Sequence, residues 1–181
     1  MKIGIISDSH DDMENVQESI SIFNRNEVEY VIHAGDYIFP GIIKEFEKSK
    51  AKLIGVLGNN DGEINGIFKS FKEINGELKG EIGEIEIDKI KFGIYHGTKM
   101  GIKENMIKSQ KYDILICGHT HQQEPPYAGK IQHTASSKTF VLNPGSSHRK
   151  SNSISKSFED VGKIILFDTQ NKSYEFIHLS K

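Results

Sequence analysis

The chain opens with Lys2-Ile-Gly-Ile-Ile-Ser-Asp-Ser-His10, a short apolar run that stops abruptly at Asp8 and His10. The run is too short for a helix and rich in isoleucine, so it predicts a buried strand. Four further apolar runs also stop at residues that can bind a metal: Asp36, Asn59, His96, and His119 with His121 two positions later. Because ligands bind at the carboxyl ends of strands in open α/β sheets, we expect these separate segments to converge.

The ligand types in this set favour a transition metal. Three residues offer oxygen and four offer imidazole nitrogen: Asp8, Asp36, Asn59, His10, His96, His119 and His121. If one carboxylate bridges, each of two ions receives four protein bonds. Mixed imidazole and carboxylate ligation suits Mn, Fe, Co, Ni or Zn better than Ca, which prefers oxygen alone. Two such ions about 3.5 to 4 Å apart can hold a bridging hydroxide as nucleophile and clamp a phosphoryl group, so phosphoester hydrolysis is the predicted reaction.

The competing interpretation is that these residues only form turns and caps, as most single Asp, Asn and His residues at strand ends do. Five independent strand ends carry ligand types, and Gly precedes three of them. The strongest local motif is Gly118-His119-Thr120-His121, where alternate residues of an extended segment can face the same side. The repetition therefore favours a site.

Length and composition predict a single domain over residues 1–181 with one well-buried core. A net charge of -2 gives no overall attraction to long duplex nucleic acid or an anionic membrane. The single cysteine, Cys117, lies in an apolar run and is expected to be a buried hydrophobe in a reducing compartment. With a strand beginning beside Met1 and no run long enough to span a bilayer, we expect a soluble cytoplasmic protein.

The order of apolar patterns predicts an α/β fold. Steps of three and four residues predict a helix from about 12 to 26, and the alternation of strands and helices up to residue 57 predicts a parallel sheet. A weaker helical pattern spans 64–74. From residue 81 alternating residues predict an antiparallel hairpin that starts a second sheet, followed by a helix over 102–111 and a terminal hairpin over 164–177. The polar run 122–138 is expected to carry a short strand or to form a rim over the site. The predicted architecture is two packed mixed β-sheets flanked by helices on both outer faces.

Five motifs occur in the order and approximate spacing of the calcineurin-like metallophosphoesterases: Asp8-x-His10, Gly35-Asp36, Gly58-Asn59-Asn60-Asp61, His96-Gly97 and Gly118-His119-x-His121. The match spans Lys2 to Ser146 and most resembles the small prokaryotic phosphodiesterases of that family. The resemblance implies a four-layer sandwich of two sheets between helices. It also implies that Asp8, His10 and His121 hold one ion, that Asn59, His96 and His119 hold the other, and that Asp36 bridges.

Asn60 departs from the broader family pattern, in which the residue after the Asn ligand is commonly a His that protonates the leaving group or stabilises the transition state. Asn cannot donate a proton as an acid, and general-acid help is typically worth about 10²- to 10⁴-fold. The small phosphodiesterase branch resembles this sequence in often lacking that His. We therefore expect a different substrate range, in which Asn60 hydrogen-bonds a phosphate oxygen and Asp61 orients a loop or a ligand. Turn formation is the alternative for both residues.

Other polar residues carry weaker expectations. His33 precedes the Gly35-Asp36 turn and is expected to be a core or supporting histidine rather than a ligand. The turn Asn143 to Ser146 resembles a family turn that closes near the metals. Residues in the polar stretches 122–138 and 148–157 are expected to be solvated or to contact substrate; these are His133, His148, Arg149 and Lys150.

Together these features predict a divalent-metal-dependent phosphodiesterase that uses two ions, with Mn first and Ni, Co, Fe or Zn as alternatives, and acts on a small phosphodiester. A phosphomonoesterase is the alternative within the same chemistry. A protein-binding scaffold is the rival class, because the small retromer subunit of eukaryotes resembles this fold and serves protein assembly. The resemblance also implies that a homo-oligomer is common at this size.

Overall fold

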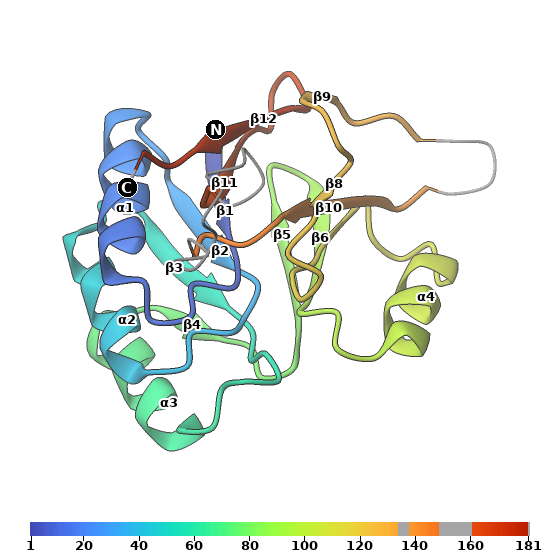
Figure 1. The fold of residues 1–181 in the computed structure, drawn as a ribbon. Helices are drawn as coiled ribbons and strands as arrows, with labels where there is room; N and C mark the ends of the chain where they lie inside the picture. The colour runs from blue at the N-terminus through green and yellow to red at the C-terminus, as the bar shows by residue number, and fades with distance from the viewer. Residues whose placement is uncertain (134–137, 149–160, 181) are drawn as a thin grey trace, which may run out of the picture.

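The computed structural model describes residues 1–133, 138–148 and 161–180 and shows two β-sheets packed together with helices on both outer sides (Figure 1). The helices are α1 Met13–Arg25, α2 Pro40–Glu45, the short 3₁₀ turn η1 Phe46–Lys48, α3 Ile64–Glu73 and α4 Met100–Lys108. The strands are β1 Lys2–Ile6, β2 Tyr30–His33, β3 Lys52–Gly55, β4 Glu77–Leu78, β5 Ile82–Ile87, β6 Ile90–Tyr95, β7 Ile114–Ile116, β8 Gln123–Glu124, β9 Gly129–Lys130, β10 Phe140–Pro144, β11 Lys163–Asp168 and β12 Ser173–His178.

The first sheet has the strand order β4-β3-β2-β1-β11-β12-β9 among the described residues. Strands β1 to β4 run parallel, and α1 to α3 connect them, as the alternating pattern predicts. The C-terminal hairpin β11–β12 returns to this sheet, where β11 pairs antiparallel with β1 and places Ile165 beside Ile5. The first strand is therefore an interior strand of the sheet, with neighbours from opposite ends of the sequence.

The second sheet has the order β5-β6-β7-β10-β8 over the same described ranges. It starts with the predicted hairpin, in which β5 pairs antiparallel with β6 across the Asp88-Lys89 turn. Strands β6, β7 and β10 then run parallel, and α4 makes the connection from β6 to β7. The two sheets are thus both mixed, and each has a group of parallel strands that ends at the same edge.

Three apolar layers hold the four structural layers together. Residues of α1 to α3 pack on the outer face of the first sheet, including Phe23 and Phe71. The middle layer joins the inner faces of the two sheets, with Ile3 and Ile5 of β1 facing Phe92 of β6 and its neighbours. Met106 of α4 packs on the outer face of the second sheet. Because both faces of the strands are buried, the strands read as apolar runs rather than as alternating ones.

The predicted elements are observed with small shifts of their ends. The first helix covers Met13–Arg25 within the expected 12–26, and the weak pattern over 64–74 forms α3. The polar run 122–138 contains two short strands, β8 and β9, which belong to different sheets; residues 134–137 of that run lie outside the described residues. Cys117 is fully buried, as expected. Within the described part of the chain, none of the helices has the length and apolar character to cross a bilayer.

Candidate metal centre

Every predicted ligand follows the carboxyl end of a strand. Asp8 and His10 follow β1, Asp36 follows β2, Asn59 follows β3, His96 follows β6, and His119 and His121 follow β7. Strands β1 to β3 are parallel neighbours in one sheet, and β6 and β7 are parallel neighbours in the other. The packing of the sheets brings the two sets of strand ends to one place, where the side chains form two groups of convergent ligand atoms.

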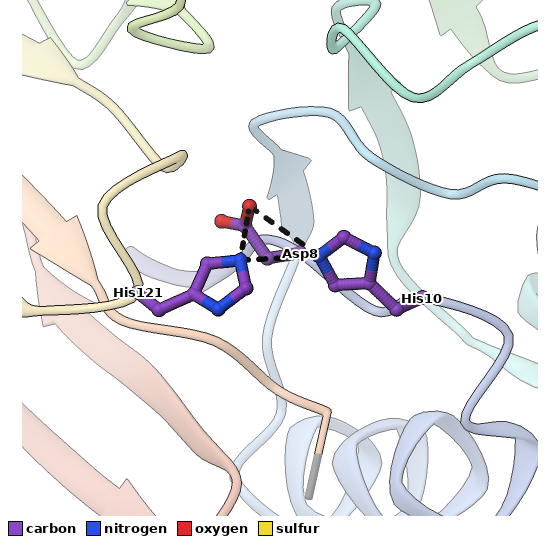
Figure 2. A group of neighbouring side chains, drawn as sticks. All are labelled: Asp8, His10 and His121. Atoms are coloured by element: carbon purple, nitrogen blue, oxygen red, sulfur yellow. Dashed lines mark hydrogen bonds and ion pairs between the residues drawn. The ribbon is translucent and has the colours of Figure 1, made fainter. Parts of the chain in front are cut away.

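The first group consists of Asp8, His10 and His121 (Figure 2). The Nε2 atoms of the two imidazoles face each other at 3.1 Å, and Asp8 Oδ1 lies 3.3 Å from His121 Nε2 and 3.9 Å from His10 Nε2. Asp8 is fully buried, whereas His10 and His121 are partly exposed. Two imidazole nitrogens and a carboxylate oxygen at this spacing form a donor set typical of a divalent transition metal.

The second group consists of Asp8, Asp36 and His96, with Asn59 beside it. His96 Nε2 lies 3.1 Å from Asn59 Oδ1, 3.3 Å from Asp36 Oδ2 and 3.9 Å from Asp8 Oδ1. On the other side of the ring, Nδ1 lies 2.8 Å from the Ala34 carbonyl oxygen, which can only accept, so Nδ1 carries a proton. In the neutral ring Nε2 then presents a lone pair to three oxygen acceptors. A cation resolves this arrangement of facing acceptors, so the residues fit a divalent ion.

Two carboxylates lie between the groups. Asp36 Oδ2 is 3.8 Å from His10 Nε2 of the first group and 3.3 Å from His96 Nε2 of the second, and Asp8 Oδ1 also contacts both groups. His119 lies beside His96 with ring centroids 5.2 Å apart, and its backbone N–H donates to Asp8 Oδ2 at 3.0 Å. The side chain of His119 is not a member of either convergent group in the described residues, so its part as a ligand stays a prediction.

The electrostatics of the site favour positive charge at the point of convergence. Burial, the largest single influence, raises the pKa of Asp36, but hydrogen bonds from His96 and Asn60 outweigh it and hold the pKa below its ordinary value. Burial also lowers the pKa of His96, and the neighbouring Asp36 and Asp8 carboxylates outweigh that effect and raise it. These contacts lower the pKa of the Asp36 carboxyl and raise the pKa of the His96 imidazole, so negative charge on Asp36 and positive charge beside it stabilise each other.

The ligand loops are held in a conformation that most residues avoid. Asp8, His10, Asp36, His119 and His121 all have positive φ values, of 52°, 42°, 61°, 70° and 57°. Non-glycine residues in this left-handed region cost about 1 to 3 kcal/mol each, and such residues cluster at functional sites where surrounding contacts hold them. The strand exits therefore turn sharply enough to aim several side chains at one point.

Comparison with known proteins assigns the family. Residues 1–172 match the family described as the calcineurin-like phosphoesterase superfamily domain. This chain belongs to the calcineurin-like phosphoesterase superfamily. It is 42% identical over 146 residues to phosphodiesterase MJ0936 of Methanocaldococcus jannaschii, a match that covers 80% of this chain and 83% of the relative. It is 23% identical over 159 residues to phosphodiesterase YfcE of Escherichia coli K12, covering 81% and 79%.

Solved structures agree with this assignment. The structure of an archaeal phosphodiesterase superposes with a TM-score of 0.83 at 38% identity, covering 99% of this chain and 100% of that one. Vps29 of Chaetomium thermophilum, at 15% identity, gives a TM-score of 0.66 over 100% of this chain and 92% of its own. The second likeness shows only that the fold is shared.

In this member of the superfamily, Asn60 contacts Asp36. Its backbone N–H donates to Asp36 Oδ1 at 2.9 Å, and its side-chain Nδ2 donates to Oδ2 at 2.7 Å. Both oxygens of the central carboxylate are thus oriented by one residue. The predicted contact between Asn60 and a substrate phosphate remains a prediction, and the observed contacts place the side chain beside the ligands.

Asp61 lies behind the candidate ligands. Its carboxylate accepts three backbone hydrogen bonds, from Gly58 at 2.7 Å, Asp36 at 3.0 Å and Ile38 at 2.8 Å. Burial, the largest influence, raises the pKa of Asp61 even though the three N–H donors lower it. The carboxylate therefore joins the exit of β2 to the exit of β3, and the role of Asp61 in orienting a loop or a ligand stays a prediction.

The turn after β10 is part of the same site. Ser146 Oγ donates to the Asp8 carbonyl at 2.8 Å, and the backbone N–H of His148 donates to the same oxygen at 3.2 Å. The His148 ring lies 5.8 Å from the His10 ring, with Nδ1 3.5 Å from Asp12 Oδ2. The resemblance predicted that this turn closes near the metals, and His148, expected to be solvated or to contact substrate, lies beside His10; Arg149 and Lys150 lie outside the described residues.

Two further residues support the site without any sequence signal. Thr98 Oγ1 donates to Asn59 Oδ1 at 3.3 Å, and Ser7 Oγ donates to Asp8 Oδ2 at 2.6 Å. Small hydroxyl residues are common in loops, so nothing in the pattern distinguishes these two from others. Their role follows only from where the packing of the sheets places them.

Proposed function

We propose that this protein is a divalent-metal-dependent phosphodiesterase that uses two ions and acts on a small phosphodiester. The observation that carries the proposal is the pair of ligand groups that share Asp8, with Asp36 Oδ2 between His10 and His96. The name of the 42% identical archaeal relative supports diester substrates. Asn60 supports the same choice, because a residue that cannot act as an acid suits esters whose leaving groups depart without protonation.

The assignment of ligands to the two ions is the one that the family resemblance implies. We assign Asp8, His10 and His121 to one ion and Asn59, His96 and His119 to the other, with Asp36 between them. Bound there, two divalent ions would polarise the phosphoryl oxygens and make a water nucleophilic at neutral pH. Asn60 orients both oxygens of Asp36, and Asp61 holds the backbone of the two loops that carry Asp36 and Asn59. Mn is the first candidate for the ion, and Ni, Co, Fe and Zn suit the same donors.

The test is hydrolysis of bis-p-nitrophenyl phosphate beside p-nitrophenyl phosphate by chelator-treated protein, with Mn, Ni, Co, Zn or Mg added back singly. We expect metal-dependent cleavage that favours the diester. His96→Gln should lower kcat/KM by at least about 100-fold, because even outer partners of ligands are worth 10- to 100-fold. The matched control is His178→Gln in β12, a histidine of the first sheet outside both ligand groups.

Each contrary result has a defined meaning. A preference for the monoester would identify a phosphatase instead. No activity with any of these metals, together with purified protein that retains no ion, would favour the protein-binding scaffold of the same fold. Equal loss in the His96 and His178 variants would show that the ligand groups are not the reacting site.

A further inference from the structure

A buried histidine lies directly beneath the ligand loops. His33, the last residue of β2, is fully buried and belongs to neither group of convergent ligand atoms among the described residues. Its Nε2 lies 3.1 Å from Ser9 Oγ, and the backbone N–H of Gly35 donates to its Nδ1 at 3.2 Å. Ser9 stands between Asp8 and His10, and its own side chain is also fully buried. The hydroxyl is therefore turned into the protein while its two neighbours carry ligand atoms.

The donor and the acceptor can be assigned in each of the hydrogen bonds that join Gly35, His33, Ser9 and Asp36. The Gly35 N–H can only donate, so Nδ1 of His33 must accept and the ring proton lies on Nε2. Nε2–H then donates to Ser9 Oγ, and the hydroxyl donates onward to the carbonyl oxygen of Asp36 at 3.4 Å. Burial lowers the pKa of His33 to about 3, in agreement with a neutral ring at this position. These hydrogen bonds run from His33 at the end of β2 to Ser9 after β1, and from Ser9 to Asp36 after β2.

The loop that these hydrogen bonds hold has a strained backbone. Asp8 and His10, on either side of Ser9, both have positive φ. Two backbone bonds already join the loops, from Asp8 N–H to the Gly35 carbonyl at 3.0 Å and from His10 N–H to the Asp36 carbonyl at 3.2 Å. The Ser9 hydroxyl reaches the same Asp36 carbonyl from below. Ser9 lies between the two ligands in the sequence, and its hydroxyl links this part of the loop to His33 and to the Asp36 carbonyl oxygen.

The ring of His33 is itself held by packing. It packs against Tyr37 in a tilted arrangement with ring centroids 4.1 Å apart, and it makes a T-shaped contact with Phe46 at 6.2 Å. A ring packed against two aromatic neighbours presents its Nε2–H at a defined position, so the hydroxyl that it contacts is positioned as well.

We propose that His33 and Ser9 are positioning residues that hold the loop carrying Asp8 and His10 against Asp36. They would thereby set the affinity of the site for a pair of metal ions. This inference rests on the proposed function, since it concerns binding of the two ions. It assigns a role to two residues that supply no ligand atom. Partners that orient ligands are typically worth about 10- to 100-fold in metal affinity, which sets the size of the expected effect.

The test is a Mn²⁺ titration of the chelator-treated protein followed by electron paramagnetic resonance, which reports free Mn²⁺ and the exchange-coupled pair separately. Ser9→Ala removes the hydroxyl, and His33→Phe keeps the ring packing while removing both hydrogen bonds. We expect each variant to bind the weaker of the two ions about 10-fold or more weakly and to lose the coupled signal at Mn²⁺ levels that saturate the wild type. His33→Gln, which can still donate to Ser9, should lie between His33→Phe and the wild type.

The matched control is Ser19→Ala in α1, which deletes another fully buried serine hydroxyl, one that donates to the Asn15 carbonyl at 2.7 Å. It should bind Mn²⁺ as the wild type does. Wild-type affinity and coupling in Ser9→Ala would overturn the inference, as would equal weakening in Ser19→Ala. If His33→Phe does not fold in chelator, Ser9→Ala decides alone. A wild-type protein that binds no pair of ions would overturn the proposed function as well, so the two failures are distinguishable.

Discussion

Replacing Asp61 by alanine tests how the two ligand loops are held together. The carboxylate is 6% exposed and accepts backbone N–H groups from Gly58, Asp36 and Ile38. Leaving a buried donor unsatisfied costs about 1 to 3 kcal/mol, and water entering the space left by the carboxylate would satisfy part of the set. We therefore expect Asp61→Ala to lower the free energy of unfolding by about 3 to 5 kcal/mol.

Asparagine at position 61 distinguishes the effect of the hydrogen-bond acceptors on stability from the effect of the negative charge. One amide oxygen can replace Oδ2 and keep the bonds from Gly58 and Asp36, while the amide NH₂ faces the Ile38 N–H. Burial raises the pKa of Asp61, which shows that the folded protein disfavours the charged form. Removal of the charge should therefore lower the free energy of unfolding less than removal of the oxygens. We expect Asp61→Asn to lose about 1 to 2 kcal/mol.

The assay is urea unfolding followed by circular dichroism, in chelator so that metal binding does not contribute to the measured stability. The control is Asp113→Ala, which removes a more exposed carboxylate that accepts one backbone N–H, from Lys91 at 2.9 Å. A loss below about 1 kcal/mol in Asp61→Ala, or no difference from the control, would refute the reasoning. If Asp61→Asn kept its stability and bound metal but lost all activity, the carboxylate would take part in the chemistry rather than in positioning.

Three further substitutions and treatments test the site and its surroundings. Asn60→Ala removes the side-chain N–H that donates to the Asp36 carboxylate, so calorimetry should show about 10-fold weaker Mn²⁺ binding, and an unchanged dissociation constant would contradict this role. Gly118→Ala would place a Cβ 1.9 Å from Ser7 Oγ, so the melting temperature and the bound metal should both fall, whereas Gly62→Ala, with nothing within 4 Å, should change neither. Burial raises the pKa of the Cys117 thiol to about 12, so a thiol reagent at pH 8 should label it only on unfolding, and rapid labelling of the native protein would show that the second sheet opens.

The sequence alone determined the local structure and the types of ligand. The strands that lead to the candidate ligands are short, mostly apolar runs, each followed by a polar residue, and the hydrophobic effect favours burial of such a run. The motifs around Asp8, Asp36, Asn59, His96 and His121 were predicted as ligand positions before any geometry, because several strand ends carrying metal-binding residues form a pattern that chance rarely produces. The family resemblance was confirmed by comparison with known proteins.

Tertiary structure decided what no single segment encodes. Strand β11 of the terminal hairpin pairs with β1, although the two strands lie near opposite ends of the sequence. Nothing local specifies this partner, because the free edge of β1 offers the same backbone N–H and C=O groups to any strand. The ties from Ser146, His148, Thr98 and Ser9 to the ligand loops are hydrogen bonds of common polar residues that acquire a role only from position. The residue types and their spacing indicate which side chains can bind a metal. The packing of the two sheets sets the distances between the ligand atoms of those side chains, and these distances determine the chemistry.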